Sequence, residues 1–517
     1  MSCGPSLAHL QNRGWVPSID VLDGDQVLKY IIEHFGPERC AMICTTNHFR
    51  WKSAFREVAK VFGYDDSQIT KLTERLKKNQ ISPLTHADSK LQKIYHFAQK
   101  IHQKPHYLGQ HPGGIIITNQ PIARHVACQY SGGSSKRKIT QIDMHNGIRE
   151  LGLIKFDILG NGSLAVLRDA LTHIKNQGLP DPQIHNLTKC EQDPKVQELL
   201  KNQGARGVFY VESPAQMRLN QKCQATTLEE IGITSSLVRP AGAPFTQTYV
   251  TRQREAQQGR QNWTYLHPSL KSVLGDTHDV LVFQEDVIRI CVEIAGMSFH
   301  DADKVRKMMN SFHEGPPSKY EQTAEIFITG CIKKHGYSKS QAQALWQRIS
   351  SFKGFSFCQS HSLSYAQLTF KCAYLKAHYP AVFLAAVLSN NHGFYSSAVY
   401  INEAYRIGIQ ILPVCINHSE YAYLGHKQTI RVGFMHIRGL HKTHIQHFIK
   451  QRQTYGLFQN FHQFLQHNTS FTIVEIEALI KVNAFASLQT SQPTLMYILH
   501  NFQKNPIQIK RRVNSER

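Results

Sequence analysis

A lysine and an aspartate two residues apart, Lys155 and Asp157, interrupt the apolar segment ELGLIKFDILGNG, residues 150–162. Residues two apart in a β-strand lie on the same face, so a strand here would present both charges together. A carboxylate in this place suits the divalent metal ions of phosphoryl transfer, but that chemistry needs a second acidic ligand. The alternative is a structural ion pair at a strand edge, and this segment alone leaves both interpretations open.

The best candidate for a second carboxylate lies near the start of the sequence, in WVPSIDVLDGD, residues 15–25. Its proline and alternating pattern predict an edge or entry strand. The alternation divides the strand into one face with Ser18, Asp20 and Leu22 and another with Ile19, Val21 and Asp23. Asp20 can therefore join Asp157, whereas Asp23 faces away unless a β-bulge turns it.

The elements around Lys155 and Asp157 determine where these charges would lie. Alternation over 151–158 predicts a strand in which Phe156 and Ile158 belong to the set that packs into a core. Apolar residues at helical spacing over 164–174 predict a helix after it, with Ser163 as the N-cap. The two charges would then lie near the end of a strand, before a glycine turn and a helix, where α/β-type architectures present chemistry.

The remaining pattern is mainly helical. Helices are predicted at 27–35 and 51–63, and a strand is predicted to follow the paired glycines of HPGGIIITNQPI, residues 111–122. Residues 200–435 are mostly helical by pattern, and Pro380 should divide 366–389 into two buried helices. These expectations place the charged strands in one mixed region and most of the chain in helices.

Composition limits the classes of function. The 517 residues carry a formal net charge of +22, which favours a polyanionic partner, with nucleic acid as the first candidate. No apolar run is long enough to cross a membrane, and no secretory signal is visible, so we expect a cytoplasmic protein without a membrane partner. The eleven cysteines never form a CxxC spacing, which argues against a disulfide framework or a zinc knuckle.

Several long segments, in a consistent order, resemble the alpha subunit of bacterial DNA polymerase III, the C-family replicative polymerase, or a divergent paralogue of it. The resemblance covers nearly all of the sequence. It is carried by PSIDVLD, HPGGIIIT, LGLIKFDILG, GVFYVES, SLVRPAG, VFQEDVIRICVEIAG, DADKVRKMM, FSFCQSHSLSYA and YLKAHYPAVFLAAVLS.

The resemblance implies a multidomain α+β fold: a nucleotidyltransferase-like palm with an inserted helical thumb, mostly helical fingers and a C-terminal helix-hairpin-helix region. The implied domains are a partial palm at 1–51 and 108–165, a thumb at 52–107, fingers at 166–431, the helix-hairpin-helix region at 432–490 and a basic tail at 491–517.

The resemblance also implies roles for individual residues. Asp20 matches the first of the family's paired catalytic aspartates, and Asp157 matches the third. Both would be catalytic and would hold Mg²⁺, while Lys155 would meet the triphosphate of the incoming nucleotide. In the fingers, the residues that match motifs lining the nucleotide and template side are Arg239, Gln284, Arg306, Lys307 and His361.

This sequence departs from the family pattern at several of its motifs. Leu22 stands where the second aspartate of the pair is expected, and a leucine cannot ligate a metal. Other departures are Gln359 for a lysine, Tyr210 for a glutamine, and His441 and Asn483 for glycines of the helix-hairpin-helix region. Only nineteen residues precede Asp20, so the family's N-terminal phosphoesterase-like domain and glycine-rich first part of the palm have no counterpart here.

Three hypotheses follow. The first is a C-family DNA polymerase that acts on primer-template DNA and deoxynucleoside triphosphates by means of two metal ions. Leu22 would impair its catalysis. The site would be completed either by a bulge that brings in Asp23 or by a separate chain that supplies the missing palm half. The second is a non-catalytic module that binds primer-template DNA. The third is the product of a decaying gene that folds poorly.

Overall fold

The computed structural model describes residues 18–77, 89–132, 136–148, 150–310, 317–352, 358–390, 393–468 and 470–504. The chain divides into two compact units between Asn161 and Gly162. Each unit is described by itself below. Within the predicted basic tail, residues 505–517 lie outside the described residues, as do residues 133–135 of the loop SGGSSKRK.

The first unit is built on a six-stranded mixed sheet with the order β1-β6-β3-β2-β5-β4. Its strands are β1 (Ser18–Val21), β2 (Cys40–His48), β3 (Pro105–Ile117), β4 (Cys128–Tyr130), β5 (Lys138–Asp143) and β6 (Lys155–Gly160). Its helices are α2 (Gly24–Phe35), α3 (Trp51–Val61), α4 (Asp66–Lys77) and α5 (Ser89–Ile101), with short turns η1 (Ile122–Arg124) and η2 (Met144–Ile148). The predicted edge position of β1 is confirmed.

Apolar side chains cover both faces of this sheet. On one face, Leu28 of α2 packs with Met42, Ile115 and Ile158, and Phe156 lies against the same cluster. A second cluster, which contains Ile116, lies on the other face. Because Phe156 and Ile158 belong to the first face, as the sequence predicted, Lys155 and Asp157 project from the face opposite α2.

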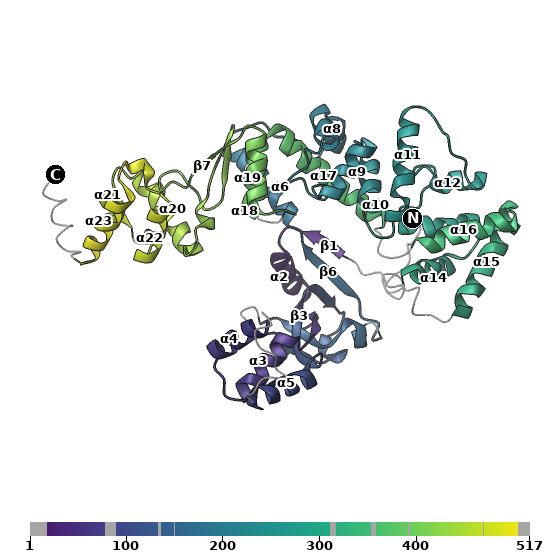
Figure 1. Cartoon of the computed structure of the whole chain (residues 1–517), viewed down its shortest axis with the longest axis horizontal. Helices are drawn as coiled ribbons and strands as arrows, with labels where there is room; N and C mark the ends of the chain where they lie inside the picture. Colours follow the sequence, from purple (N-terminus) through teal and green to yellow (C-terminus); the bar gives the residue numbers. More distant parts are fainter. Residues whose placement is uncertain are drawn as a thin grey trace. The chain divides into compact units, whose positions relative to one another are not determined.

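Helices α3, α4 and α5 are inserted between the paired strands β2 and β3 and pack around a core of their own (Figure 1). The two ends of this insertion are joined by backbone hydrogen bonds. Phe49 N donates to Lys104 O at 2.9 Å, and Gln103 N donates to Phe49 O at 2.8 Å. The insertion is therefore closed at its base, directly beside the sheet.

The second unit is mainly helical. Its helices are α6 (Gly162–Asn176), α7 (Leu187–Gln192), α8 (Pro194–Lys201), α9 (Pro214–Cys223), α10 (Leu228–Leu237), α11 (Thr246–Gln257), α12 (Lys271–Leu274), α13 (Gln284–Arg289), α14 (Phe299–Asn310), α15 (Pro317–His335), α16 (Lys339–Ser351), α17 (Gln359–His378), α18 (Pro380–Asn390), α19 (Ser397–Arg406), α20 (Lys442–Tyr455), α21 (Phe461–His467), α22 (Ile473–Lys481) and α23 (Gln492–Lys504). Its short turns are η3 (Ala243–Phe245), η4 (Pro268–Leu270), η5 (Ile290–Ile294), η6 (Phe434–His436) and η7 (Ala486–Leu488).

Three apolar cores run along this second unit. The largest joins α6 to α10 with α17 and α18, and a second lies among α12 to α16. A small sheet with the order β7-β9-β8 precedes the third core, which is formed by α20 to α23. Its strands are β7 (Gln410–Leu412), β8 (Leu424–His426) and β9 (Thr429–Arg431).

Most elements lie where the sequence predicted them, and three details differ. The predicted break at Pro380 is confirmed, because α17 ends at His378 and α18 begins at Pro380. The strand expected to begin after the paired glycines instead runs from Pro105 through both of them. Residues 151–154 precede β6 rather than belonging to it. Ser163 is not an N-cap, because α6 already includes Gly162.

Candidate active site

The two predicted aspartates lie on adjacent parallel strands. β1 pairs with β6 in a continuous register in which Ser18 is opposite Asp157 and Asp20 is opposite Leu159. Partners in this register share a face, so Asp20 and Asp157 lie on the same face, one pleat repeat apart. From strand spacing and rise, their Cα atoms are separated by roughly 8 Å, which allows the two carboxylates to approach one ligand.

The bulge that would turn Asp23 toward this face is absent from the β1–β6 pairing. Asp23 instead caps α2, since its Oδ1 accepts hydrogen bonds from Asp25 N at 3.0 Å and Gln26 N at 3.1 Å. The hypothesis of a site completed by Asp23 is therefore wrong for this structure. Leu22 directly follows β1 and is 38 % exposed.

Asp157 has an incompletely satisfied carboxylate. Lys155 Nζ lies 3.1 Å from Asp157 Oδ1, and His111 Nδ1 lies 3.8 Å from the same oxygen. The lysine contact lacks hydrogen-bond geometry, so Oδ1 is buried without a hydrogen-bond donor among the described residues. Buried polar atoms are normally hydrogen-bonded, so this oxygen calls for an explanation such as a bound water molecule, an ion or a catalytic role.

The motif HPGG supplies His111, which contacts both Lys155 and Asp157. His111 Nδ1 accepts hydrogen bonds from Gly114 N at 2.6 Å and from Gly113 N at 3.2 Å, and His111 Nε2 lies 3.2 Å from Lys155 Nζ. Burial lowers the pKa of His111, the charge of Lys155 lowers it further, and Asp157 opposes both. The imidazole is therefore expected to be neutral near pH 7.

Close packing explains why two glycines follow His111. A Cβ on Gly113 would collide with the carbonyl oxygen of Ile158, and a Cβ on Gly114 would lie 2.8 Å from His111 Nδ1 and 2.9 Å from Lys155 Cε. Sequence reasoning treated HPGG only as the start of a strand and missed His111. The available signal was a polar residue placed before two glycines, which allow a close backbone approach.

Three of the five predicted fingers residues form one contact group. Arg306 Nη1 donates to Gln284 Oε1 at 3.0 Å, and both Arg306 and Lys307 bind Asp303, at 2.8 and 2.9 Å. Burial raises the pKa of Asp303, but the hydrogen bonds from Lys307 and Arg306 outweigh it and hold the pKa below the usual value. Asp303 is thus a carboxylate that keeps two cations in place.

Of the other two predicted fingers residues, Arg239 lies near enough to Tyr210 for its charge to act on it, and His361 is linked to Tyr210 through Tyr365. The His361 ring centroid lies 4.1 Å from that of Tyr365, which makes an edge contact with Tyr210 at 5.2 Å. Burial raises the pKa of Tyr210, and hydroxyl groups nearby and the charge of Arg239 oppose it.

A hydrogen bond joins these two groups of fingers residues. Gln359 N, at the start of α17, donates to Glu285 Oε2 at 2.9 Å, and Glu285 is next to Gln284. The bond links the start of α17 to α13, and all five predicted residues belong to the second unit, whereas Asp20, Lys155 and Asp157 belong to the first.

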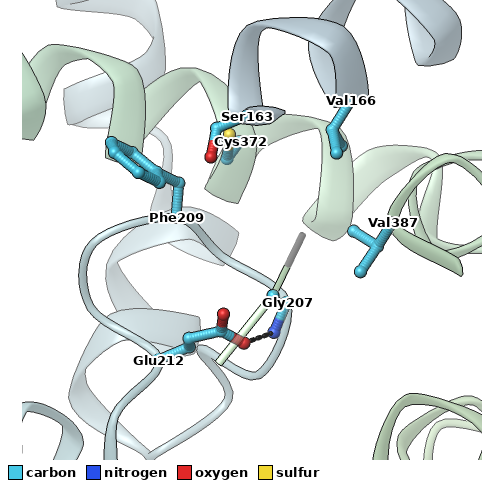
Figure 2. Close-up of a pocket in the computed structure, with 8 residues that line it drawn as sticks. Ser163, Val166, Gly207, Phe209, Glu212, Cys372 and Val387 are labelled. Atoms are coloured by element: carbon cyan, nitrogen blue, oxygen red, sulfur yellow. Dashed lines mark hydrogen bonds between the residues drawn. The ribbon is translucent and has the colours of Figure 1, made fainter. Parts of the chain in front are cut away.

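The motif GVFYVES also encloses a small pocket of about 30 Å³, lined by Ser163, Val166, Gly207, Phe209, Glu212, Cys372, Val387 and Gly393. Figure 2 shows Glu212 turned toward Gly207, whose N donates to Glu212 Oε2 at 2.9 Å. Phe394 N and the Tyr400 hydroxyl also donate to this carboxylate, at 2.6 and 2.8 Å. Glu212 is therefore fully used in holding loops together, and the pocket has room for about one water molecule.

The helix-hairpin-helix region accommodates both replaced glycines. Asn483 has φ +58°, a left-handed conformation that asparagine tolerates better than most residues. His441 N donates to Glu475 Oε1 at 3.0 Å, and His444 Nδ1 lies 2.9 Å from Glu475 Oε2. Burial raises the pKa of Glu475, but these contacts and its hydrogen bonds with Thr472 outweigh it and lower the pKa to about 2.

Two further features are absent from the described residues. Within the described ranges, no group of three or more His, Cys, Asp or Glu side chains is arranged to hold a metal ion. No helix in the described part of the chain is both long enough and apolar enough to cross a membrane.

Three family models match consecutive parts of the chain. The bacterial DNA polymerase III alpha NTPase domain matches residues 12–160, and the finger domain of the same subunit matches 163–335. A helix-hairpin-helix motif matches 408–495. These matches follow the order in which the mixed sheet, the helical region and the C-terminal core occur.

Curated relatives match over most of the chain. An error-prone DNA polymerase of Teredinibacter turnerae is 30 % identical over 503 residues, which are 92 % of this chain and 47 % of the relative. One of Idiomarina loihiensis is 29 % identical over 502 residues, with the same coverage. A DNA polymerase III subunit alpha of Staphylococcus epidermidis is 27 % identical over 503 residues, 94 % of this chain and 46 % of the relative. The chain spans slightly less than half the length of these relatives, and it belongs to the family of the bacterial DNA polymerase III alpha subunit.

Proposed function

We propose that this chain is a C-family DNA polymerase that transfers deoxynucleotides from their triphosphates to a primer, directed by a template. The observation that carries the proposal is the β1–β6 pairing, which brings Asp20 and Asp157 to one face while Asp157 Oδ1 has no hydrogen-bond donor among the described residues. The names of the relatives support the same activity, since each is a DNA polymerase or its alpha subunit.

The residues present fit a bound Mg²⁺. Mg²⁺ prefers oxygen ligands from one or two carboxylates and keeps several waters, and two carboxylates on neighbouring strands meet that requirement. Asp157 and Asp20 are the two residues that would hold the cation. When bound, divalent cations stabilise the charge of the transferring phosphoryl group and activate the attacking oxygen.

The chain's own residues would bind and orient the nucleotide. Lys155 lies beside Asp157 and would pair with the triphosphate. In the fingers, cations suited to the charge that develops in phosphoryl transfer are supplied by Arg239, Arg306 and Lys307, with Gln284 and His361 beside them. Asp303 would hold Arg306 and Lys307 in fixed positions before substrate arrives.

Leu22 is expected to weaken catalysis. It lies one residue beyond β1, on the face of Asp20 if the strand alternation continues, and it supplies no ligand. The site then has two acidic ligands rather than three. We expect slow primer extension whose rate depends strongly on the concentration of Mg²⁺ or Mn²⁺.

Primer extension with substituted chains tests the proposal. Extension in Mg²⁺ or Mn²⁺ should disappear in Asp157→Ala, because the chain loses a ligand that no other residue replaces. Leu22→Asp should raise the rate of primer extension. Leu22→Asn should raise it far less, because asparagine has the shape of aspartate but carries no charge. Extension that survives in Asp157→Ala would contradict the assignment of the site.

A second candidate function is a primer-template DNA-binding module without catalysis. The net charge of +22 and the loss of an acidic ligand at Leu22 favour it. Its binding should fall steeply as salt rises, because phosphate contacts release counterions. Salt-sensitive binding of primer-template, with no extension even in Leu22→Asp, would support this function over the polymerase.

A separate chain that completes the palm is a further part of the proposal. β1 is the edge strand of the sheet that the described residues form, so another strand could pair along its outer side. Such a chain would add its strand directly beside Asp20. Extension that appears only when a second polypeptide is added would support it.

A further inference from the structure

The imidazole of His111 is held by the backbone rather than by other side chains. Nδ1 accepts hydrogen bonds from the amides of Gly113 and Gly114, two and three residues farther along β3. These bonds fix both the plane of the ring and its tautomer. Because Nδ1 is the acceptor, the single proton of the neutral ring lies on Nε2.

Nε2 faces the ammonium group of Lys155 at 3.2 Å. With a proton on each of these nitrogens, the contact repels the ammonium and limits how closely it can approach the ring. Lys155 Nζ also lies 3.1 Å from Asp157 Oδ1, which attracts it and which is itself 3.8 Å from His111 Nδ1. The lysine side chain is only 9 % exposed, so it has little freedom between these two groups.

We propose that His111 is a positioning residue that keeps the Lys155 ammonium against Asp157, at one defined point of the site. A catalytic role for this position of Lys155 rests on the proposed function, in which Lys155 binds the triphosphate of the nucleotide. The contact itself does not depend on the chemistry. It follows from the ring, the two glycine amides and the neighbouring strand β6.

Strand pairing makes this arrangement rigid. β3 pairs antiparallel with β6, with Gly114 opposite Asp157 and Ile116 opposite Lys155. The strand that carries the ring is thus hydrogen-bonded to the strand that carries the ammonium. A side chain on Gly114 would enter the space shared by His111 Nδ1 and Lys155 Cε.

The position of Lys155 can be measured without any catalytic assay. We would label the full chain with a small amine-reactive acetylating reagent and follow each lysine by peptide mass spectrometry. Lys104, which is exposed in the same unit, serves as the internal reference. In the unsubstituted chain, Lys155 should react much more slowly than Lys104, because its ammonium is confined.

Three substitutions should change that rate in a defined order. His111→Ala removes the ring, and Gly114→Ala displaces the ring and the lysine without removing either, so both should raise the labelling of Lys155 several-fold relative to Lys104. His111→Asn can still accept from the glycine amides and should give an intermediate rate. Gly132→Ala is the matched control, because a Cβ there meets no atom within 4 Å.

An unchanged Lys155 rate in a folded His111→Ala chain would overturn the proposal. If His111→Ala does not fold, as judged by circular dichroism, the rates in His111→Asn and Gly114→Ala decide in its place. A rate in both equal to that of Gly132→Ala would overturn the proposal equally.

A second measurement separates this inference from the proposed function. In primer extension, His111→Ala should raise the KM for the nucleotide by about 10-fold, with a smaller effect on kcat, because a misplaced cation weakens triphosphate binding by about 1.4 kcal/mol. Faster labelling in His111→Ala, with a nucleotide KM unaffected even by Lys155→Ala, would leave the positioning intact and remove the polymerase role of Lys155.

Discussion

Each unit of the molecule buries a lysine beside a carboxylate, and the two pairs differ in how completely they are hydrogen-bonded. Lys376 Nζ binds Glu403 Oε1 at 2.7 Å and two backbone carbonyls at 2.6 Å each, while Arg406 binds Glu403 through two bonds of 2.8 Å. Asp157 has the single close cation Lys155 and an oxygen without a donor among the described residues.

Under the proposed function, the complete pair is structural and the incomplete pair belongs to the catalytic site. Burial lowers the pKa of Lys376 to about 8, although Glu403 opposes this shift. Burial raises the pKa of Glu403, but its bonds with Arg406 and Lys376 outweigh it and lower the pKa. A buried charge that has all its partners contributes to a fixed fold, whereas one that lacks a partner suits a ligand.

The largest expected effect is on catalysis at the incomplete pair. Asp157→Asn should reduce primer extension by about 10³-fold or more, as loss of a catalytic group commonly does. Its free energy of unfolding should fall less than that of Glu403→Gln, because Asp157 pairs with Lys155 alone whereas Glu403 binds both Lys376 and Arg406. Single-turnover extension and urea unfolding measure the two quantities, and a large loss of stability with normal extension would break the comparison.

At the complete pair the effect should fall on stability instead. Glu403→Gln should lower the free energy of unfolding by about 3–5 kcal/mol, because it leaves Lys376 buried without its counter-charge. Urea unfolding, followed by helix content, measures the change. The control is Glu293→Gln, since the Arg289–Glu293 pair is exposed. Replacing both members, Lys376→Met with Glu403→Gln, should restore part of the loss.

Glu475 extends the comparison to the C-terminal core. It has several donors, as Glu403 does, so Glu475→Gln should cost about 2 kcal/mol of stability. Because its folded pKa is lowered to about 2, its contribution should be fully present above the ordinary carboxyl pKa and should be lost as the pH falls toward 2. Urea unfolding between pH 6 and about pH 2.5 measures this loss, and an equal pH dependence in Glu475→Gln would contradict it.

The smallest effect should occur at an exposed pair. Lys29 and Glu33 lie 3.8 Å apart on α2, with side chains 74 % and 65 % exposed. Solvent and salt screen such a pair, so Glu33→Gln should leave the unfolding midpoint unchanged within error. A clear shift of that midpoint would show that burial does not explain the ranking of these carboxylates.

The sequence predicted the incomplete pair better than the complete one. Alternation placed Lys155 and Asp157 on one face of the same strand, because the period of a strand is a local property. Lys376 lies in an equally apolar segment, AYLKAHYP, yet its partner Glu403 is on a different helix. Contacts between distant segments depend on helix packing, which no local pattern records.

The errors of sequence reasoning have similar causes. Ser163 matched the N-cap preference, but the turn before α6 is shorter than that assignment required, and the serine became buried inside the helix. The strand before HPGG was missed because Pro105 and several polar residues conceal its alternation. His111 was missed because its role depends on Lys155, 44 residues later. The domain boundaries implied by the resemblance remain predictions.

The closed base of the α3–α5 insertion has a consequence for how this protein can change. Backbone hydrogen bonds join Phe49 to Gln103 and Lys104, so the two ends of the insertion are held together where the chain leaves the sheet and returns to it. The helices beyond this hydrogen-bonded base can be lengthened, shortened or exchanged at a modest entropic cost. Natural variation in the α3–α5 insertion, or a sequence grafted into it, should therefore change the contacts that the insertion makes while the pairing of β3 with β6 stays the same.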